Sequence, residues 1–164
     1  MNENHKVLVV DDDPLFRTVI QRQLTHLGYA CECAGDGRTA LRLLDSEDFD
    51  VALIDIVMPG MDGLALLQSM EQAHMSTVPI ALSGGDSTAS AVEAMKHGAF
   101  DYLCKEANFD RLRDTVQKAV HHRETRRRSL LAAKSAQQWE ATFDAVPDLV
   151  AIIDADHRIV RANR

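Results

Sequence analysis

Short apolar runs alternate with helical patterns along the first ~120 residues, and this alternation constrains the possible folds most strongly. Every residue of Val7–Val10 is apolar, as is typical of a strand buried on both faces. The expected strands are Val7–Val10, Tyr29–Cys33, Val51–Ile54, Val78–Leu82 and Phe100–Cys104. Apolar residues recur at helical spacing between and after these runs. The pattern therefore predicts an α/β fold with a doubly wound, five-stranded parallel sheet.

Polar side chains stand where these strands end. Asp11 and Asp12 follow the first strand, and Asp55 follows the third. Ser83 and Lys105 follow the fourth and fifth strands. Functional groups of such sheets collect at the carboxyl ends of the strands, so we expect all five side chains at one edge.

The residue types at this edge indicate a particular chemistry. Three neighbouring carboxylates repel one another unless a cation is present. Mg²⁺ suits such a cluster, because it prefers oxygen ligands and commonly rests on carboxylates together with a phosphate. Lys105 and the hydroxyl of Ser83 would hold the remaining phosphate oxygens. The cluster therefore predicts phosphoryl transfer onto a carboxylate, with Asp55 as the nucleophile.

Four stretches also carry a family resemblance, and they are Val9–Pro14, Asp50–Gly63, Pro79–Gly84 and Gly98–Lys105. Over about residues 5–122 the sequence resembles the receiver domain of bacterial two-component response regulators. The resemblance implies the flavodoxin-like receiver fold. It also implies a phosphorylation switch rather than a conventional enzyme, with a sensor histidine kinase or phosphotransfer protein as the phosphohistidine donor.

By resemblance, the roles at the strand ends can be assigned by position. Asp55 would be the phosphoacceptor and a Mg²⁺ ligand. Asp12 would bind Mg²⁺ directly, and Asp11 would act mainly through a metal-bound water. The backbone carbonyl of Val57 would complete the protein ligands. Val57 and Gly85 lack the polar side chains that can position a hydrolytic water, so the lifetime of the phosphoryl group is left open.

The resemblance assigns the switch as well. Ser83 would rotate toward the phosphoryl group, Lys105 would pair with it, and Tyr102 would turn inward as Ser83 moves. Family members usually have a proline in a cis bond after the lysine, whereas Glu106 follows Lys105 here. A cis bond before a non-proline residue costs about 2.5–4 kcal/mol, which favours a trans or rearranged loop.

Two alternatives stay open from the sequence. A Mg²⁺-dependent phosphatase of the haloacid dehalogenase type would use Asp11 as its nucleophile, but Leu15 stands where that motif wants Thr or Val. A phosphorylation-independent scaffold would act mainly by dimerising.

Charge and composition exclude other classes of protein. Residues 1–106 carry 7 basic and 17 acidic side chains, whereas residues 107–164 carry 11 and 8. An acidic body argues against direct nucleic-acid binding. No apolar run is long enough for a membrane span or a signal peptide, so we expect a cytoplasmic protein. The cysteines, Cys31, Cys33 and Cys104, are expected to be reduced, with the first two as small buried residues rather than half of a metal site.

No Gly or Pro interrupts residues 107–146, so one long helix is expected to continue beyond the receiver. Spacings of four and three relate Leu112, Val116, Ala119, Arg123, Arg126, Leu130 and Ala133. This heptad rhythm favours a linker helix over residues 123–138, with a dimeric coiled coil as an open possibility. The basic residues of the linker, Arg123 and 126–128, are interpreted as a solvated helix face.

The last segment has a different pattern. Residues 139–148 resemble the entry to a PAS sensor domain, and 149–153 with 158–161 form a hairpin pattern. We expect residues 139–164 to be the truncated start of a PAS domain. Histidine kinases and cyclic-dinucleotide enzymes are both common outputs after such an arrangement.

Overall fold

A computed structural model of the chain describes residues 5–85, 88–145, 147, 150–156 and 158–163. The chain divides into two compact units, Met1–Arg123 and Glu124–Arg164. In the described residues no helix is both long enough and apolar enough to cross a membrane.

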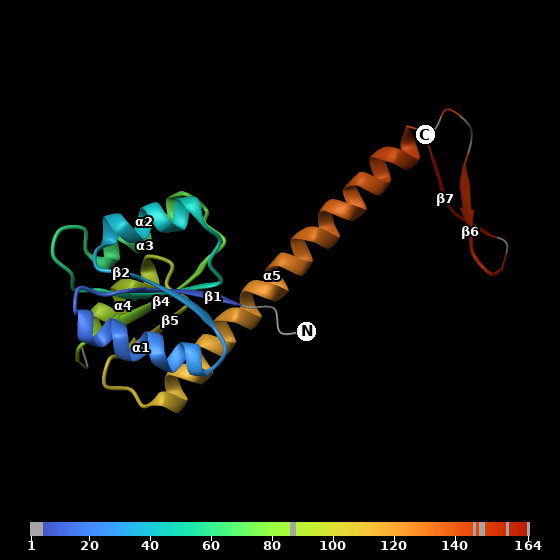
Figure 1. Cartoon of the computed structure of the whole chain (residues 1–164). Helices are drawn as coiled ribbons and strands as arrows, with labels where there is room; N and C mark the ends of the chain where they lie inside the picture. The colour runs from blue at the N-terminus through green and yellow to red at the C-terminus, as the bar shows by residue number, and fades with distance from the viewer. Residues whose placement is uncertain (1–4, 86–87, 146, 148–149, 157, 164) are drawn as a thin grey trace. The chain divides into compact units, whose positions relative to one another are not determined.

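The first unit contains the predicted parallel sheet, with strand order β2-β1-β3-β4-β5 (Figure 1). Its strands are β1 (Lys6–Val10), β2 (Ala30–Ala34), β3 (Val51–Asp55), β4 (Val78–Ser83) and β5 (Asp101–Cys104). Its helices are α1 (Pro14–His26), α2 (Gly37–Ser46), α3 (Gly63–Gln72), α4 (Thr88–Lys96) and the beginning of α5 (Phe109–Asp144). The prediction of a doubly wound α/β fold is confirmed.

The predicted bounds of all five strands are wrong by one residue: β1, β3 and β4 are each one residue longer, β2 is shifted by one residue, and β5 begins one residue later. Tyr29 lies before β2, because its amide donates to Leu24 in the turn that ends α1. Phe100 lies before β5, and the register of that strand begins with Ile80 opposite Asp101. Short strands are bounded by hydrogen bonds to neighbours, which apolar patterns do not specify.

Alternate residues of the central strands feed two separate cores. Leu8 and Val10 point into the core beneath α2, α3 and α4. Val7 and Val9 point into the core shared with α1 and α5. Both faces of the sheet are therefore covered by helices, as Figure 1 shows. A binding site is accordingly expected at the ends of the strands rather than on a face of the sheet.

Aspartates begin three of the helices. The side chain of Asp13 accepts from the amides of Leu15 and Phe16, and Pro14 takes the first helical position. Asp36 and Asp62 cap α2 and α3 in the same way. Such caps stabilise a helix by about 1 kcal/mol each.

The three cysteines are free and partly buried, with Cys31 and Cys33 packed against the core beneath α1 and α5. Burial, together with neighbouring Cys33, raises the pKa of the Cys31 thiol to about 12. The protonated thiol is a weak metal ligand, which agrees with the interpretation of these cysteines as packing residues.

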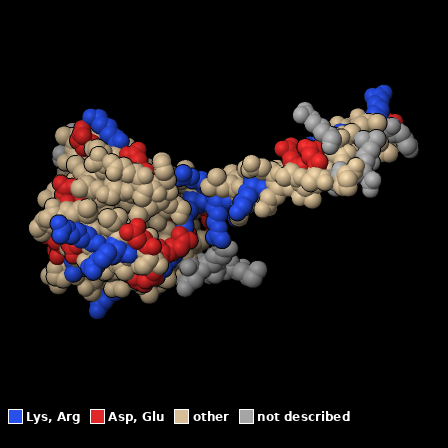
Figure 2. All heavy atoms as spheres, turned by 90° about the horizontal axis from the view of Figure 1, so that it is seen from above, with Lys and Arg blue, Asp and Glu red and all other residues tan. Residues whose placement is uncertain are grey.

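In the second unit, α5 continues without a break to Asp144, so the prediction of one long helix is confirmed. Exposed basic side chains lie toward the amino end of this extension, and acidic ones lie farther along it (Figure 2). The arginines at 126–128 are exposed as predicted, but Arg123 in the first unit is buried. Its assignment to a solvated face is therefore wrong.

A hairpin follows the helix, as predicted. Strands β6 (Ala151–Ile153) and β7 (Ile159–Ala162) pair in antiparallel fashion. The ring of Trp139 stacks on that of Phe143 at 4.9 Å, and the guanidinium of Arg161 lies 5.0 and 5.4 Å from the two ring centres. Arg161 also pairs with Glu140 at 3.1 Å, so this side chain links the hairpin to the end of α5.

Candidate functional site

The sheet brings the predicted strand-end residues to one edge. Strand β3 pairs with both β1 and β4, so Asp55 at its end lies between the ends of those two strands. The amide of Lys105 donates to the carbonyl of Ser83 at 2.8 Å, which extends the pairing of β4 with β5 by one residue. The parallel arrangement thus positions Asp11, Asp55, Ser83 and Lys105 together.

Three carboxylates form an acidic cluster at this edge. Oxygen atoms of Asp11, Asp12 and Asp55 lie within 4.8 Å of one another. Asp11 and Asp55 are buried, whereas Asp12 is exposed. The cluster is therefore closed toward the core and open toward solvent.

One oxygen of this cluster is not satisfied by hydrogen bonds. Oδ1 of Asp11 accepts from the amide of Asp13 at 2.8 Å. Oδ2 of Asp11 is buried and has no partner with hydrogen-bond geometry, although the ammonium of Lys105 lies 2.6 Å away as an ion pair. A buried, unsatisfied carboxylate oxygen beside two further carboxylates fits a hard divalent cation such as Mg²⁺.

Lys105 is the cation at this site. Its Nζ donates to Oδ2 of Asp55 at 2.9 Å and lies 4.8 Å from the centre of the Phe16 ring. Burial lowers the pKa of Lys105, but the close contacts with the carboxylates of Asp11 and Asp55 outweigh burial and leave the pKa raised. The described residues contain no cis peptide bond, so the bond from Lys105 to Glu106 is trans. A proline is thus not needed to bring this lysine to Asp55.

The carboxylate of Asp55 is held from two sides. Its Oδ1 accepts from the amide of Val57 at 3.2 Å, and its Oδ2 accepts from Lys105. Burial raises the pKa of Asp55, and the hydrogen bonds from Lys105 and Val57 oppose that rise only in part. The loop after Asp55 turns back closely, because a Cβ on Gly63 would lie 2.1 Å from the carbonyl oxygen of Asp55.

The two predicted switch residues meet at one backbone carbonyl. The hydroxyl of Ser83 donates to the carbonyl of Gly85 at 3.4 Å, and the hydroxyl of Tyr102 donates to the same oxygen at 3.1 Å. Ser83 is buried and Tyr102 is half-buried. The backbone carbonyl of Gly85 therefore connects Ser83 at the site with Tyr102. The φ of Gly85 is 149°, a backbone conformation that residues other than glycine rarely adopt.

Sequence reasoning missed Arg17. Its guanidinium donates to the backbone carbonyl of Asp11, and its backbone amide donates to Asp13 at 3.1 Å. A Cβ on Gly35 would lie 3.3 Å from Nη1 of Arg17, so the guanidinium fits closely against the loop after β2. The helical spacing of Arg17, one turn after the Asp13 cap, was the available signal.

A family model described as "Response regulator receiver domain" matches residues 7–117. The chain is 35% identical to the DNA-binding transcriptional regulator NtrC of Escherichia coli (strain K12) over 158 residues, which cover 96% of this chain and 33% of NtrC. The chain thus spans about a third of the length of this curated relative.

Solved structures agree with this match. The Francisella response regulator 1452 receiver domain superposes with a TM-score of 0.69 at 36% identity, covering 73% of this chain and 98% of that one. The response regulator protein TrrA from Thermotoga maritima, in complex with Mg²⁺ and BeF, superposes with a TM-score of 0.65 at 30% identity, covering 70% and 98%. With its acidic cluster at the predicted sheet edge, the chain belongs to the response regulator receiver domain family.

Proposed function

We propose that this chain is the phosphoacceptor of a two-component phosphorelay, with Asp55 as the residue that is phosphorylated. One observation carries the proposal: the buried carboxylate of Asp55 is paired with Lys105 and lies beside the unsatisfied oxygen of Asp11. The donor would be a phosphohistidine on a sensor histidine kinase or a phosphotransfer protein.

The transfer forms one bond and breaks one. A carboxylate oxygen of Asp55 bonds to phosphorus, the phosphorus–nitrogen bond of the phosphohistidine breaks, and its electron pair stays on the imidazole nitrogen. The product is an acyl phosphate on Asp55. Ionised Asp55 is required, and its contacts with Lys105 and the amide of Val57 favour that form.

Mg²⁺ would be held by Asp11, Asp12, Asp55 and the carbonyl of Val57, and it supplies positive charge to the phosphoryl oxygens when bound. Lys105 binds one of the phosphoryl oxygens with a charge-assisted hydrogen bond. Its raised pKa keeps it protonated at neutral pH.

The proposed switch uses the hydroxyls of Ser83 and Tyr102, which both donate to the carbonyl of Gly85. When Ser83 turns its hydroxyl toward the phosphoryl group, its bond to the carbonyl of Gly85 is lost. Tyr102 then turns inward and changes the surface of α4, β5 and α5. Because α5 continues into residues 124–144, the change is passed to the linker.

The output is proposed to be a PAS-linked module, from the hairpin pattern after Trp139. The alignment with NtrC, a DNA-binding transcriptional regulator, supports a transcriptional output as a second candidate, because it covers 96% of this chain. Homodimerisation through the linker helix is compatible with either output.

The test is the intact mass of the protein after incubation with Mg²⁺ and acetyl phosphate. We expect one added phosphoryl group on the wild type and none on Asp55→Asn. Asp48→Asn, an exposed aspartate outside the site, is the matched control and should gain the group. An adduct that survives in Asp55→Asn and is lost in Asp11→Asn would support the phosphatase alternative instead.

A further inference from the structure

Arg123 occupies a buried position where an apolar residue is expected. On α5, Leu112, Val116 and Ala119 face the core beneath α1 and are buried. Arg123 follows Ala119 by four residues on the same stripe and is only 8% exposed. After Arg123 the helix is exposed almost throughout, apart from half-buried Glu124 and buried Phe143.

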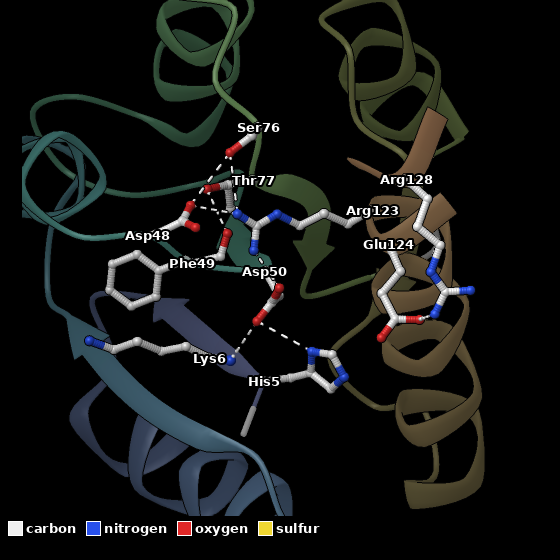
Figure 3. A network of polar contacts seen from close by, with 10 residues as sticks. All are labelled: His5, Lys6, Asp48, Phe49, Asp50, Ser76, Thr77, Arg123, Glu124 and Arg128. Carbon is white, nitrogen blue, oxygen red and sulfur yellow. Dashed lines mark hydrogen bonds and ion pairs between the residues drawn. The ribbon is translucent and has the colours of Figure 1, made fainter. Parts of the chain in front are cut away.

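The guanidinium of Arg123 is bound by two aspartates and a serine (Figure 3). Nη1 donates to Oδ1 of Asp50, and Nη2 donates to Oδ1 of Asp48 and, at 3.3 Å, to Oγ of Ser76. We call Arg123 with these three partners the Arg123 anchor. A planar guanidinium can bind several acceptors at once, which an ammonium of similar length cannot reproduce.

The anchor lies on backbone that the sheet holds firmly. The amide of Asp50 donates to Lys6 at 2.7 Å, and its carbonyl accepts from Val78 at 3.0 Å. Its Oδ2 accepts from the amide of Lys6 at 2.8 Å and lies 3.5 Å from Nδ1 of His5. Asp50 is thus tied to β1 and β4, directly before β3, which ends in Asp55 at the opposite edge.

The exposed part of α5 begins just after Arg123. Starting a helix is costly, and most helical stability in proteins comes from tertiary packing of one face. In the described residues, 125–142 are all exposed, so tertiary packing supports little of this stretch. The extension therefore continues a helix that is already formed up to Arg123, without packing of its own along 125–142.

We propose that the Arg123 anchor holds the last receiver turn of α5 to the sheet, so that the exposed helix propagates from it and follows the state of Asp55. Phe109, the first residue of α5, lies four residues after Lys105, which binds Asp55, and the anchor lies at Arg123, where the receiver part of α5 ends. The extension thus follows a segment that is packed on the core through Leu112, Val116 and Ala119 and is held at its end by Arg123. The signalling half of this inference rests on the proposed function.

The test is hydrogen–deuterium exchange of the whole chain, read by peptide, with and without Mg²⁺ and beryllofluoride. Arg123→Gln should accelerate exchange from about residue 120 onward by roughly ten- to a hundredfold, the factor expected when hydrogen bonds to a charged group are lost. Arg126→Gln, an exposed arginine of the same helix, should leave exchange unchanged. Arg123→Lys should be intermediate.

The anchor is overturned if Arg123→Gln exchanges like Arg126→Gln. It is also overturned if exchange rises in β1 and β3 but not in residues 124–144, because Arg123 would then support only the stability of the receiver. If Arg123→Gln does not fold, the milder Asp50→Asn replaces it, with the same expected pattern at a smaller factor.

The beryllofluoride arm separates the two proposals. In the wild type we expect exchange to change around Ser83 and Tyr102 and within 124–144; in Arg123→Gln we expect only the first change. No change around Ser83 in the wild type would contradict the proposed function, while exchange without beryllofluoride would still test the anchor. A change in 124–144 that persists in Arg123→Gln would overturn the signalling role of the anchor.

Discussion

Acidic side chains paired with a cation lie at both ends of β3, but the two ends differ in how fully their carboxylate oxygens are hydrogen-bonded. Asp50, directly before the strand, has Oδ1 bound by Arg123 and Oδ2 bound by the amide of Lys6. At the other end, Lys105 pairs with both Asp55 and Asp11, but the buried Oδ2 of Asp11 has only this ion pair, at 2.6 Å, and no hydrogen bond. At each end a long cationic side chain, Arg123 or Lys105, binds two aspartates.

The difference separates a structural network from a binding site. A fully satisfied polar network gives a unique local structure, because each group would be costly to leave unpaired. An unsatisfied buried oxygen is costly unless something else binds it. The amino end of β3 therefore holds the receiver together, while the carboxyl end is suited to receive a cation and a phosphoryl group.

The largest expected effect comes from breaking the satisfied end. Arg123→Met should lower the free energy of unfolding by about 2–4 kcal/mol, because it leaves the half-buried carboxylate of Asp50 without its cation. Urea denaturation measures this change. Arg126→Met should change stability by less than about 0.5 kcal/mol. Equal effects of the two substitutions would mean that the network at Asp50 is not the stabilising element.

Filling the unsatisfied end should stabilise the protein. Mg²⁺ should raise the melting temperature, and at a concentration 100 times the dissociation constant the gain is about 2.7 kcal/mol. Asp11→Asn should remove most of this gain, because it neutralises one of the two buried carboxylates of the cluster. Asp50→Asn should retain it. A melting temperature that does not respond to Mg²⁺ in the wild type would argue against the metal site.

A smaller effect concerns the burial of Asp55. In metal-free buffer, Asp55→Asn should be more stable than the wild type at neutral pH by a few degrees in melting temperature, because burial disfavours the charged carboxylate.

The advantage of Asp55→Asn should depend on pH in a defined direction. The pKa of Asp55 is raised above 3.8, so below that value the wild-type carboxyl is protonated in both states and the advantage is small. It should grow as the pH rises toward the raised pKa and then level off. Melting curves across this window measure it, and an advantage that shrinks with rising pH would contradict the assignment.

The smallest effect separates the two aspartates of the Arg123 anchor. The side chain of Asp48 is 75% exposed and that of Asp50 only 18%. Asp48→Asn should therefore cost less than about 1 kcal/mol in urea denaturation, because exposed ion pairs contribute little, and Asp50→Asn should cost more. The reverse order would place the main contact of the anchor on Asp48.

Much of the site at the carboxyl end of β3 could be predicted from the sequence. The apolar runs set the strands, and residues after parallel strands share one edge, so Asp11, Asp55 and Lys105 were expected to meet, and they do. The linker helix was predicted because no Gly or Pro interrupts residues 107–146. The shared carbonyl of Gly85 was not expected, because a backbone acceptor has no sequence signature.

At the amino end of β3, the prediction that Arg123 lies on a solvated helix face was wrong, and the reason is physical. Arginines 123 and 126–128 form one basic run, and composition alone assigns such a run to solvent. Whether one arginine is buried depends on which face of the helix meets the sheet and on acidic groups far away in sequence. Arg123 lies 73 residues from Asp50 along the chain.

The sequence by itself determined the parallel sheet, its helical cover and the edge where Asp11, Asp12, Asp55, Ser83 and Lys105 collect, because these follow from local periodicity and from the common direction of the strands. Only the tertiary structure decided which carboxylate oxygens are satisfied and which are not. Satisfaction of a buried charge depends on distances between atoms that are remote in sequence. For that reason the contacts of Arg123, and the buried Oδ2 of Asp11 that lacks a hydrogen bond, are visible only in the folded structure.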